Sequence, residues 1–157
     1  MGDLVFNIAK GRVAELHSRV DNNDPANSAI IVVPVSRGAV TDATLKDFDT
    51  LSAVLAGGVT ERNTGGWTRK TLTDADTPAV TPDDTNDRQD VGTGLAAQTW
   101  TAVTTGAVTD LLLCYDNDTT GGTDANLVPM VCLDFPITPD GSDVQWQPNA
   151  RGYYTAS

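Results

Sequence analysis

The segment Ala29–Val35 constrains the fold of this chain more than any other, because it is an unbroken apolar run with the sequence AIIVVPV. Most of its residues are β-branched, which favours a strand. A strand without alternating polar residues is covered on both faces. We therefore expect other parts of the chain to pack above and below it. Pro34 cannot donate a ladder hydrogen bond, which predicts a place near a sheet edge or a strand end.

The segment Asn7–Val20 has the spacing of an amphipathic helix. Its apolar residues recur at steps of four, three and four, at Ala9, Val13, Leu16 and Val20. Asn7 is the expected N-cap, and the run Asp21–Pro25 ends the helix because proline cannot continue it. Gly11 is the weak point, since glycine in a helix interior costs about 1 kcal/mol relative to alanine.

A second helix is predicted over Leu45–Ala56, where the apolar residues Leu45, Phe48, Leu51, Val54 and Leu55 form one stripe. Gly57 and Gly58 end it. Asp49 and Thr50 allow a shorter helix that begins later, since both residue types are good N-caps.

From Trp67 onward, short runs rich in threonine, valine and aromatic residues alternate with glycine, aspartate and proline, as in antiparallel β-proteins. Strands are predicted over Trp67–Leu72, Arg88–Val91, Gln98–Val103, Thr109–Tyr115, Leu127–Phe135 and Val144–Gln147. Turns are expected at Thr77–Thr85, Asp116–Asp124 and Thr138–Ser142. The predicted fold class is α+β, mainly β. A single domain of residues 1–157 would have a helix-containing part (1–60) and then an antiparallel β-sandwich or barrel (61–157).

The net charge of −11 comes entirely from residues 71–157. Residues 1–70 carry eight basic and eight acidic side chains, and residues 71–157 carry two and thirteen. Nearly all the acids are aspartates, which favour turns over helices. The acidity therefore belongs to loops, where it favours solubility.

Composition also argues against several classes of partner. Strong negative charge repels nucleic acid, and the longest apolar run is far shorter than the roughly 20 residues that span a bilayer. The N-terminus does not resemble a secretory signal peptide. We thus expect neither direct nucleic-acid binding nor a membrane span.

Two acidic segments are candidates for chemistry. The first, Asp116–Asp124, begins like a calcium loop, but the position of the closing glutamate is Leu127, and strands flank it instead of helices. A solvated hairpin loop is the favoured interpretation. The second, Asp83–Asp90, could pair carboxylates as glycosidases do, but a hydrated loop with an ion pair between Asp87 and Arg88 is preferred.

His17 is the only histidine, so any histidine-dependent catalytic group must include it. No nucleophile motif accompanies it, and a partly exposed structural role is expected. Cys114 and Cys132 lack zinc spacing, and we expect buried free thiols, although strand pairing could bring them close. We assign no catalytic, cofactor-binding or metal-ligating residue.

The aromatic residues allow two interpretations. Trp67, Trp100 and Trp146 either fill the core, which we favour, or form an exposed platform that stacks against sugars. Tyr153 and Tyr154 are adjacent, and neighbouring strand residues point to opposite faces. One tyrosine could pack on its own domain and the other on a neighbouring protein.

Several stretches carry a family resemblance that spans nearly the whole chain. They are Phe6–Glu15, Asn23–Ala29, Asp83–Arg88, Gln98–Thr101 and Asp116–Asn126. Together they resemble small virion structural proteins, of the capsid decoration or head accessory type, encoded by tailed phages of actinobacteria.

The resemblance implies a non-enzymatic subunit that coats the lattice of the major capsid protein, often as a trimer at local three-fold positions. Its implied location is the outer surface of the phage head, after assembly in the host cytoplasm. The charge-balanced N-terminal part, with Arg12, Arg19, Arg37 and Lys46, is the expected lattice-facing side. Two alternatives are a tail or baseplate subunit and, with less support, a carbohydrate-binding module that uses exposed tryptophans and a calcium loop.

Overall fold

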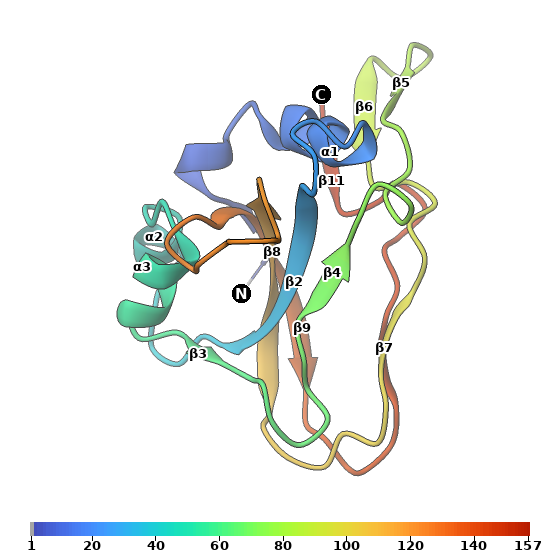
Figure 1. Cartoon of the computed structure of the whole chain (residues 1–157). Helices are drawn as coiled ribbons and strands as arrows, with labels where there is room; N and C mark the ends of the chain where they lie inside the picture. Colours follow the sequence, from blue (N-terminus) through green and yellow to red (C-terminus); the bar gives the residue numbers. More distant parts are fainter. Residues whose placement is uncertain (1) are drawn as a thin grey trace.

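The computed structural model describes residues 2–157 and is mainly β, with short helices (Figure 1). The helical elements are the 3-10 turn η1 (Asn7–Ala9) and the α-helices α1 (Val13–Asp21), α2 (Asp42–Leu45) and α3 (Leu51–Ala56). The strands are β1 (Leu4–Val5), β2 (Ala29–Ser36), β3 (Thr60–Glu61), β4 (Lys70–Leu72), β5 (Thr81–Asp83), β6 (Arg88–Val91), β7 (Gln98–Trp100), β8 (Val108–Asp116), β9 (Val128–Ile137), β10 (Val144–Trp146) and β11 (Tyr154–Ala156).

The central sheet has six strands in the order β1-β9-β8-β2-β3, with β4 also paired to β2. All its pairings are antiparallel. Two small antiparallel sheets, β10-β7 and β11-β6-β5, complete the fold. The predicted α+β, mainly β class is confirmed. Within residues 2–157 the three sheets have no pairing that would close them into a barrel.

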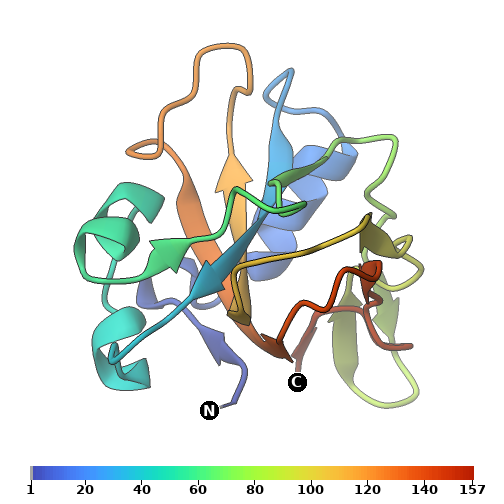
Figure 2. The ribbon, with the colours of Figure 1, turned by 90° about the horizontal axis from the view of Figure 1, so that it is seen from below.

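Each face of the central sheet is covered by its own apolar core. On one face Ile30 and Val32 of β2 pack with α1 and with residues of the two small sheets. On the other face Ile31 and Val33 pack with α2 and α3. Both views show α2 and α3 on one side of the central strands and β5 and β6 on the other (Figures 1 and 2). The expectation that Ala29–Val35 is covered on both faces is thus confirmed.

Pro34 lies near a strand end, one of the two places predicted for it, because β2 ends at Ser36, but it does not lie at a sheet edge. β2 lies between β8 on one side and β3 and β4 on the other. The Pro34 carbonyl accepts a hydrogen bond from the Arg62 N–H at 2.8 Å, so the backbone of Pro34 faces the β3 side. There the pairing of β2 with β4 stops at Val32, opposite Lys70, and its pairing with β3 starts at Val35, opposite Glu61. The missing N–H falls in this gap, where no partner strand needs it.

The first helix is shorter than predicted, because the chain bends at Gly11. That residue has φ +74°, a left-handed conformation that ends η1 and precludes a continuous helix from Asn7. α1 begins at Val13, and Asn7 caps nothing. The predicted apolar stripe is correct from Val13 on, since Val13, Leu16 and Val20 are buried.

The second predicted helix is instead two short ones, α2 and α3. α3 is the shorter helix that the sequence allowed as an alternative, and Thr50 is its N-cap. Thr50 Oγ1 accepts a hydrogen bond from the Ala53 N–H at 3.1 Å. Thr41 caps α2 in the same way. The chain turns between the end of α2 at Leu45 and the start of α3 at Leu51. The predicted apolar stripe is therefore divided between two helices.

Thr50→Ala is expected to lower the free energy of unfolding by about 1 kcal/mol, because the Ala53 N–H loses its capping partner. Urea titration measures the change. Ser52→Ala is the control, since Ser52 is exposed on the same helix and its side chain has no recorded bond. An equal effect of both substitutions would contradict a capping role for Thr50.

The six predicted strands all exist, five of them with shifted ends. Arg88–Val91 has the predicted bounds, β8 and β9 are longer than predicted, and β4, β7 and β10 are shorter. The predicted turn Thr77–Thr85 contains β5, a strand that the sequence analysis missed together with β1 and β3. These missed strands have two or three residues and no alternating pattern. No helix within residues 2–157 is long and apolar enough to cross a membrane.

Candidate functional site

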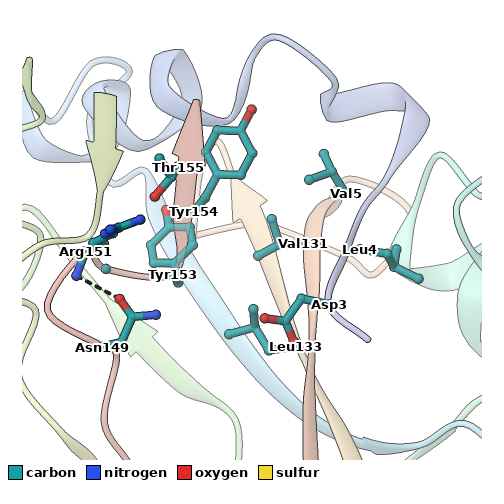
Figure 3. A pocket seen from close by; sticks show the side chains of 11 residues that line it. Asp3, Leu4, Val5, Val131, Leu133, Asn149, Arg151, Tyr153, Tyr154 and Thr155 are labelled. Atoms are coloured by element: carbon teal, nitrogen blue, oxygen red, sulfur yellow. Dashed lines mark hydrogen bonds between the residues drawn. The ribbon is translucent and has the colours of Figure 1, made fainter. Parts of the chain in front are cut away.

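An open groove runs between the β1–β9 edge of the central sheet and the C-terminal segment 145–155 (Figure 3). It has two adjoining parts with volumes of about 350 and 450 Å³. Both parts are lined by Asp3, Leu133, Asn149, Gly152 and Tyr153. Tyr154 and Thr155 of β11 border the first part, and Phe135 and Gln145 border the second.

One wall of the groove is shaped by how β1 meets β9. β1 is short and pairs with β9 at Val131 and Cys132. The carboxylate of Asp3 then accepts a hydrogen bond from the Asp134 N–H at 2.8 Å. The next residues of β9 have no strand beside them on this side, so Leu133 and Phe135 border open space.

The opposite wall depends on a tight turn at Gly152. Its N–H donates to the Asn149 carbonyl at 2.9 Å, and its φ of +80° is left-handed. A Cβ there would lie 1.9 Å from the Val91 carbonyl oxygen, so only glycine fits. The turn directs Tyr153 back to β6, where its N–H donates to the Val91 carbonyl at 2.9 Å.

The two walls differ in charge. Asp3 and Asp134, both exposed, carry the negative charge of the β1–β9 wall. The segment 144–157 contains no acidic residue, and Arg151 is its only cation. The C-terminal wall is therefore free of acidic side chains and carries one positive charge.

Tyr153 connects the groove to α1 through His17, which is buried. The prediction that His17 is partly exposed is wrong. His17 is 0% exposed. Its Nε2 lies 2.7 Å from the Pro78 carbonyl, which can only accept, so Nε2 carries the proton and Nδ1 accepts from the Tyr153 hydroxyl at 2.9 Å. The neutral ring thus joins α1, the loop before β5 and the C-terminal segment. Burial lowers the pKa of His17 below its ordinary value, although the Pro78 carbonyl and the Asp21 charge oppose this shift.

The lowered pKa of His17 predicts a loss of stability in weak acid. At pH values between the pKa of His17 in the folded protein and its ordinary value of about 6.5, the unfolded chain binds one more proton than the folded protein. The free energy of unfolding therefore rises with pH in this window, and the contribution of His17 is fully present above it. The slope reaches at most about 1.4 kcal/mol per pH unit, the value for one proton. Urea titrations between pH 5 and 7.5 measure it. His17→Gln is expected to be less stable but to lack this slope, and an unchanged slope in the variant would contradict the assignment.

Arg37 is also buried, which corrects its predicted place on a lattice-facing surface. Its side chain is 1% exposed and forms an ion pair with Asp110, itself 1% exposed. Arg37 Nε donates to Asp110 Oδ2 at 3.2 Å, and Thr109 Oγ1 donates to the same oxygen at 2.6 Å. The half-exposed carboxylate of Asp42 adds a second ion pair. This network joins the end of β2 to β8 and α2.

The two cysteines are free and buried, as predicted. Burial raises the pKa of Cys114 to about 12. Burial and the Asp110 charge raise the pKa of Cys132 as well. The thiolate is the nucleophilic form of cysteine, so neither thiol is activated. β8 and β9 do pair as a hairpin, but Cys132 lies opposite Leu112 and Cys114 opposite Pro129, and no disulfide forms.

The three tryptophans are core residues, so the alternative of an exposed sugar-stacking platform is wrong. Trp67 and Trp100 are 1% exposed and Trp146 is 7% exposed. Trp67 and Trp100 pack with ring centroids 5.3 Å apart. Their indole N–H groups each donate to a backbone carbonyl at 2.7 Å, those of Gly106 and Thr68.

The loop Asp116–Asp124 connects β8 and β9 as a largely exposed hairpin loop, as favoured, and its aspartates diverge. Asp116 is buried and accepts from the Asp118 N–H at 3.1 Å, Asp118 bonds Thr120, and Asp124 pairs with Arg69 at 2.7 Å. No group of three or more potential ligand residues within 2–157 could hold a metal ion. The arrangement that a calcium-assisted module requires is therefore not present in these residues.

The segment Asp83–Asp90 forms the β5–β6 hairpin. Arg88 pairs with Asp83 at 2.9 Å and with Asp90 at 3.0 Å, so the predicted pair with Asp87 is wrong. Asp87 has φ +48° in the hairpin turn, which it takes because aspartate tolerates this conformation.

Sequence reasoning did not find the groove. Its lining comes from residues 3–5, 131–135 and 145–155, which no periodic pattern links. The adjacent tyrosines were the one usable signal. As predicted for one of them, Tyr153 packs on its own domain, and the partly exposed Tyr154 borders the groove; a neighbour for Tyr154 stays a prediction.

Comparisons with known proteins complete this description. No family model, no curated protein and no solved structure matches the chain.

Proposed function

We propose that this protein is a non-enzymatic virion structural subunit that decorates the phage head by binding the lattice of the major capsid protein. The observation that carries the proposal is the open groove, which offers a long binding surface on a rigid β scaffold. The resemblance of Phe6–Glu15 and Asp116–Asn126 to small virion proteins supplies the viral setting. Self-association into a trimer at local three-fold positions belongs to the same proposal.

The surface supports such a role through its uneven charge. Exposed aspartates lie on the loops that follow residue 70, such as Asp74, Asp84 and Asp140. A decoration subunit needs a hydrated outer face and a less charged contact face, since interface centres are depleted of charge. The acid-free segment 144–157 provides such a face.

The N-terminal region is a poorer contact face than the sequence indicated. Arg12 and Arg19 are exposed, but both pair with Glu15, at 3.1 and 2.9 Å. A deletion of residues 1–22 would not show whether this region contacts the capsid lattice. It would also remove Phe6, Val13, Leu16 and Val20, which belong to the core. Of the four cations first assigned to the lattice side, Arg12, Arg19 and Lys46 keep some exposure.

Quantitative mass spectrometry of purified virions tests the function. A decoration subunit follows the symmetry of the shell, so the chain is expected in fixed ratio to the major capsid protein, on the order of hundreds of copies per particle. Electron cryo-microscopy is expected to place it on the outer head surface. A ring of tens of copies on the tail would support a tail or baseplate subunit instead, and absence from particles would overturn both assignments.

A further inference from the structure

We propose that the groove binds an extended, basic segment of a partner protein, which adds as a strand to the free edge of β11. This inference rests on the proposed function and deepens it, because it names the kind of segment through which the capsid partner is held. Three features point to such a segment: an unpaired strand edge, a groove beside it, and the charge of the facing wall.

β11 is the unprotected edge of its sheet. In the order β11-β6-β5, the outer strands are β11 and β5. β5 carries Pro82 and Asp83, and proline and charge are the usual devices that prevent strand addition. β11 carries neither, with the sequence YTA. Among the described residues, the backbone of Tyr154–Ala156 has no recorded partner other than β6.

The facing edge is closed to strand addition. The Asp134 N–H is already bonded to Asp3, and Pro136 has no N–H to donate. An extended segment in the groove therefore pairs with β11 and only contacts the β1–β9 wall. Its alternate side chains would meet Val131 and Leu133, two of the apolar residues that line the first part.

Charge selects a basic segment. Asp3 and Asp134 border the groove, and these two carboxylates disfavour an acidic peptide there. A lysine or arginine on the polar side of an added strand would approach these two carboxylates. Arg151 on the opposite wall disfavours more than a few such cations.

The test uses the full chain and a fluorescent synthetic peptide of seven residues with alternating valine and lysine. Binding is followed by anisotropy, and its position by amide chemical shifts. The largest shifts are expected at residues 133–135 and 153–156. A version of the peptide methylated at alternate backbone nitrogens is expected not to bind, because it cannot complete a strand ladder.

Two matched variants separate a local contact from net charge. Asp134→Asn removes a groove carboxylate and is expected to weaken peptide binding about five-fold, the size of an exposed ion pair. Asp84→Asn removes the same charge from the exposed β5–β6 hairpin and is expected to leave binding unchanged.

Equal weakening by both variants, equal binding of the methylated peptide, or shifts away from the groove would each overturn the proposal. So would a lack of binding, or occupation of the groove by a second copy, seen as concentration-dependent dimers in sedimentation with shifts at the same residues. None of these results depends on the copy number of the chain in virions. Failure of this inference is therefore distinguishable from failure of the proposed function.

Discussion

Asp110→Ala is expected to lower the free energy of unfolding by about 3–5 kcal/mol, because it removes the buried carboxylate opposite a buried guanidinium. Both Arg37 and Asp110 are 1% exposed, so water cannot replace the lost partner without opening the core. Thr109 Oγ1 and the Cys132 thiol would lose an acceptor as well. Chemical denaturation of the variant measures the change.

Asp42→Ala is the matched control for this network. Asp42 also pairs with Arg37, but its side chain is 49% exposed, so water takes its place and less than about 1 kcal/mol is lost. A combined Arg37→Met and Asp110→Leu variant should recover most of the stability lost in Asp110→Ala, since apolar replacement of both buried charges is often neutral. If Asp42→Ala proves as damaging as Asp110→Ala, burial does not govern the energy of this network.

Gly152→Ala is expected to have the second largest effect, a loss of about 2–5 kcal/mol. A Cβ at this position would lie 1.9 Å from the Val91 carbonyl oxygen and 2.7 Å from the Gly92 carbonyl carbon, so the backbone must move. Overpacking of this kind costs about 1–3 kcal/mol, and the left-handed φ of +80° adds about 1–2 kcal/mol for any residue with a Cβ. Hydrogen exchange at the Tyr153 N–H should accelerate, because the turn directs that group to β6.

Gly94→Ala separates the two contributions. Gly94 has φ +82°, almost the same conformation, and an added Cβ there meets nothing within 4 Å. We expect a loss of about 1–2 kcal/mol from backbone conformation alone. Equal losses at both glycines would mean that the close approach to β6 has no energetic weight, and the account of the groove wall would need revision.

Both predictions concern residues whose importance the sequence did not indicate. Arg37 follows a predicted strand and resembles a surface cation, and Asp110 is one acid among many. Burial of a charged pair depends on which strands become neighbours, since β2 and β8 are adjacent although more than seventy residues separate Arg37 from Asp110. Gly152 likewise gains its role from the proximity of β6, more than fifty residues away in the chain.

His17 illustrates the same limit. Its position beside the apolar stripe of α1 was clear from spacing, but its full burial depends on Tyr153 and Pro78, which approach from two other segments. A local pattern reports which face of an element is apolar. It does not report which distant polar group will satisfy a side chain on that face.

The sequence by itself determined the elements with strong local signals. The β-branched run of β2, the apolar stripe of α1 and the alternation of the later strands were sufficient for a mainly β, α+β fold with two covered sheet faces. These signals are properties of short segments, because residue volume, branching and period act within a few residues. The burial of the tryptophans and cysteines also followed from residue type. Tertiary structure alone decided the breaks at Gly11 and between α2 and α3, the internal place of Pro34, the buried pair of Arg37 and Asp110, and the groove. Each of these features arises where segments far apart in the chain meet. Whether a hydrogen bond is satisfied, a charge is buried or a strand edge is open depends on which distant segment lies beside it.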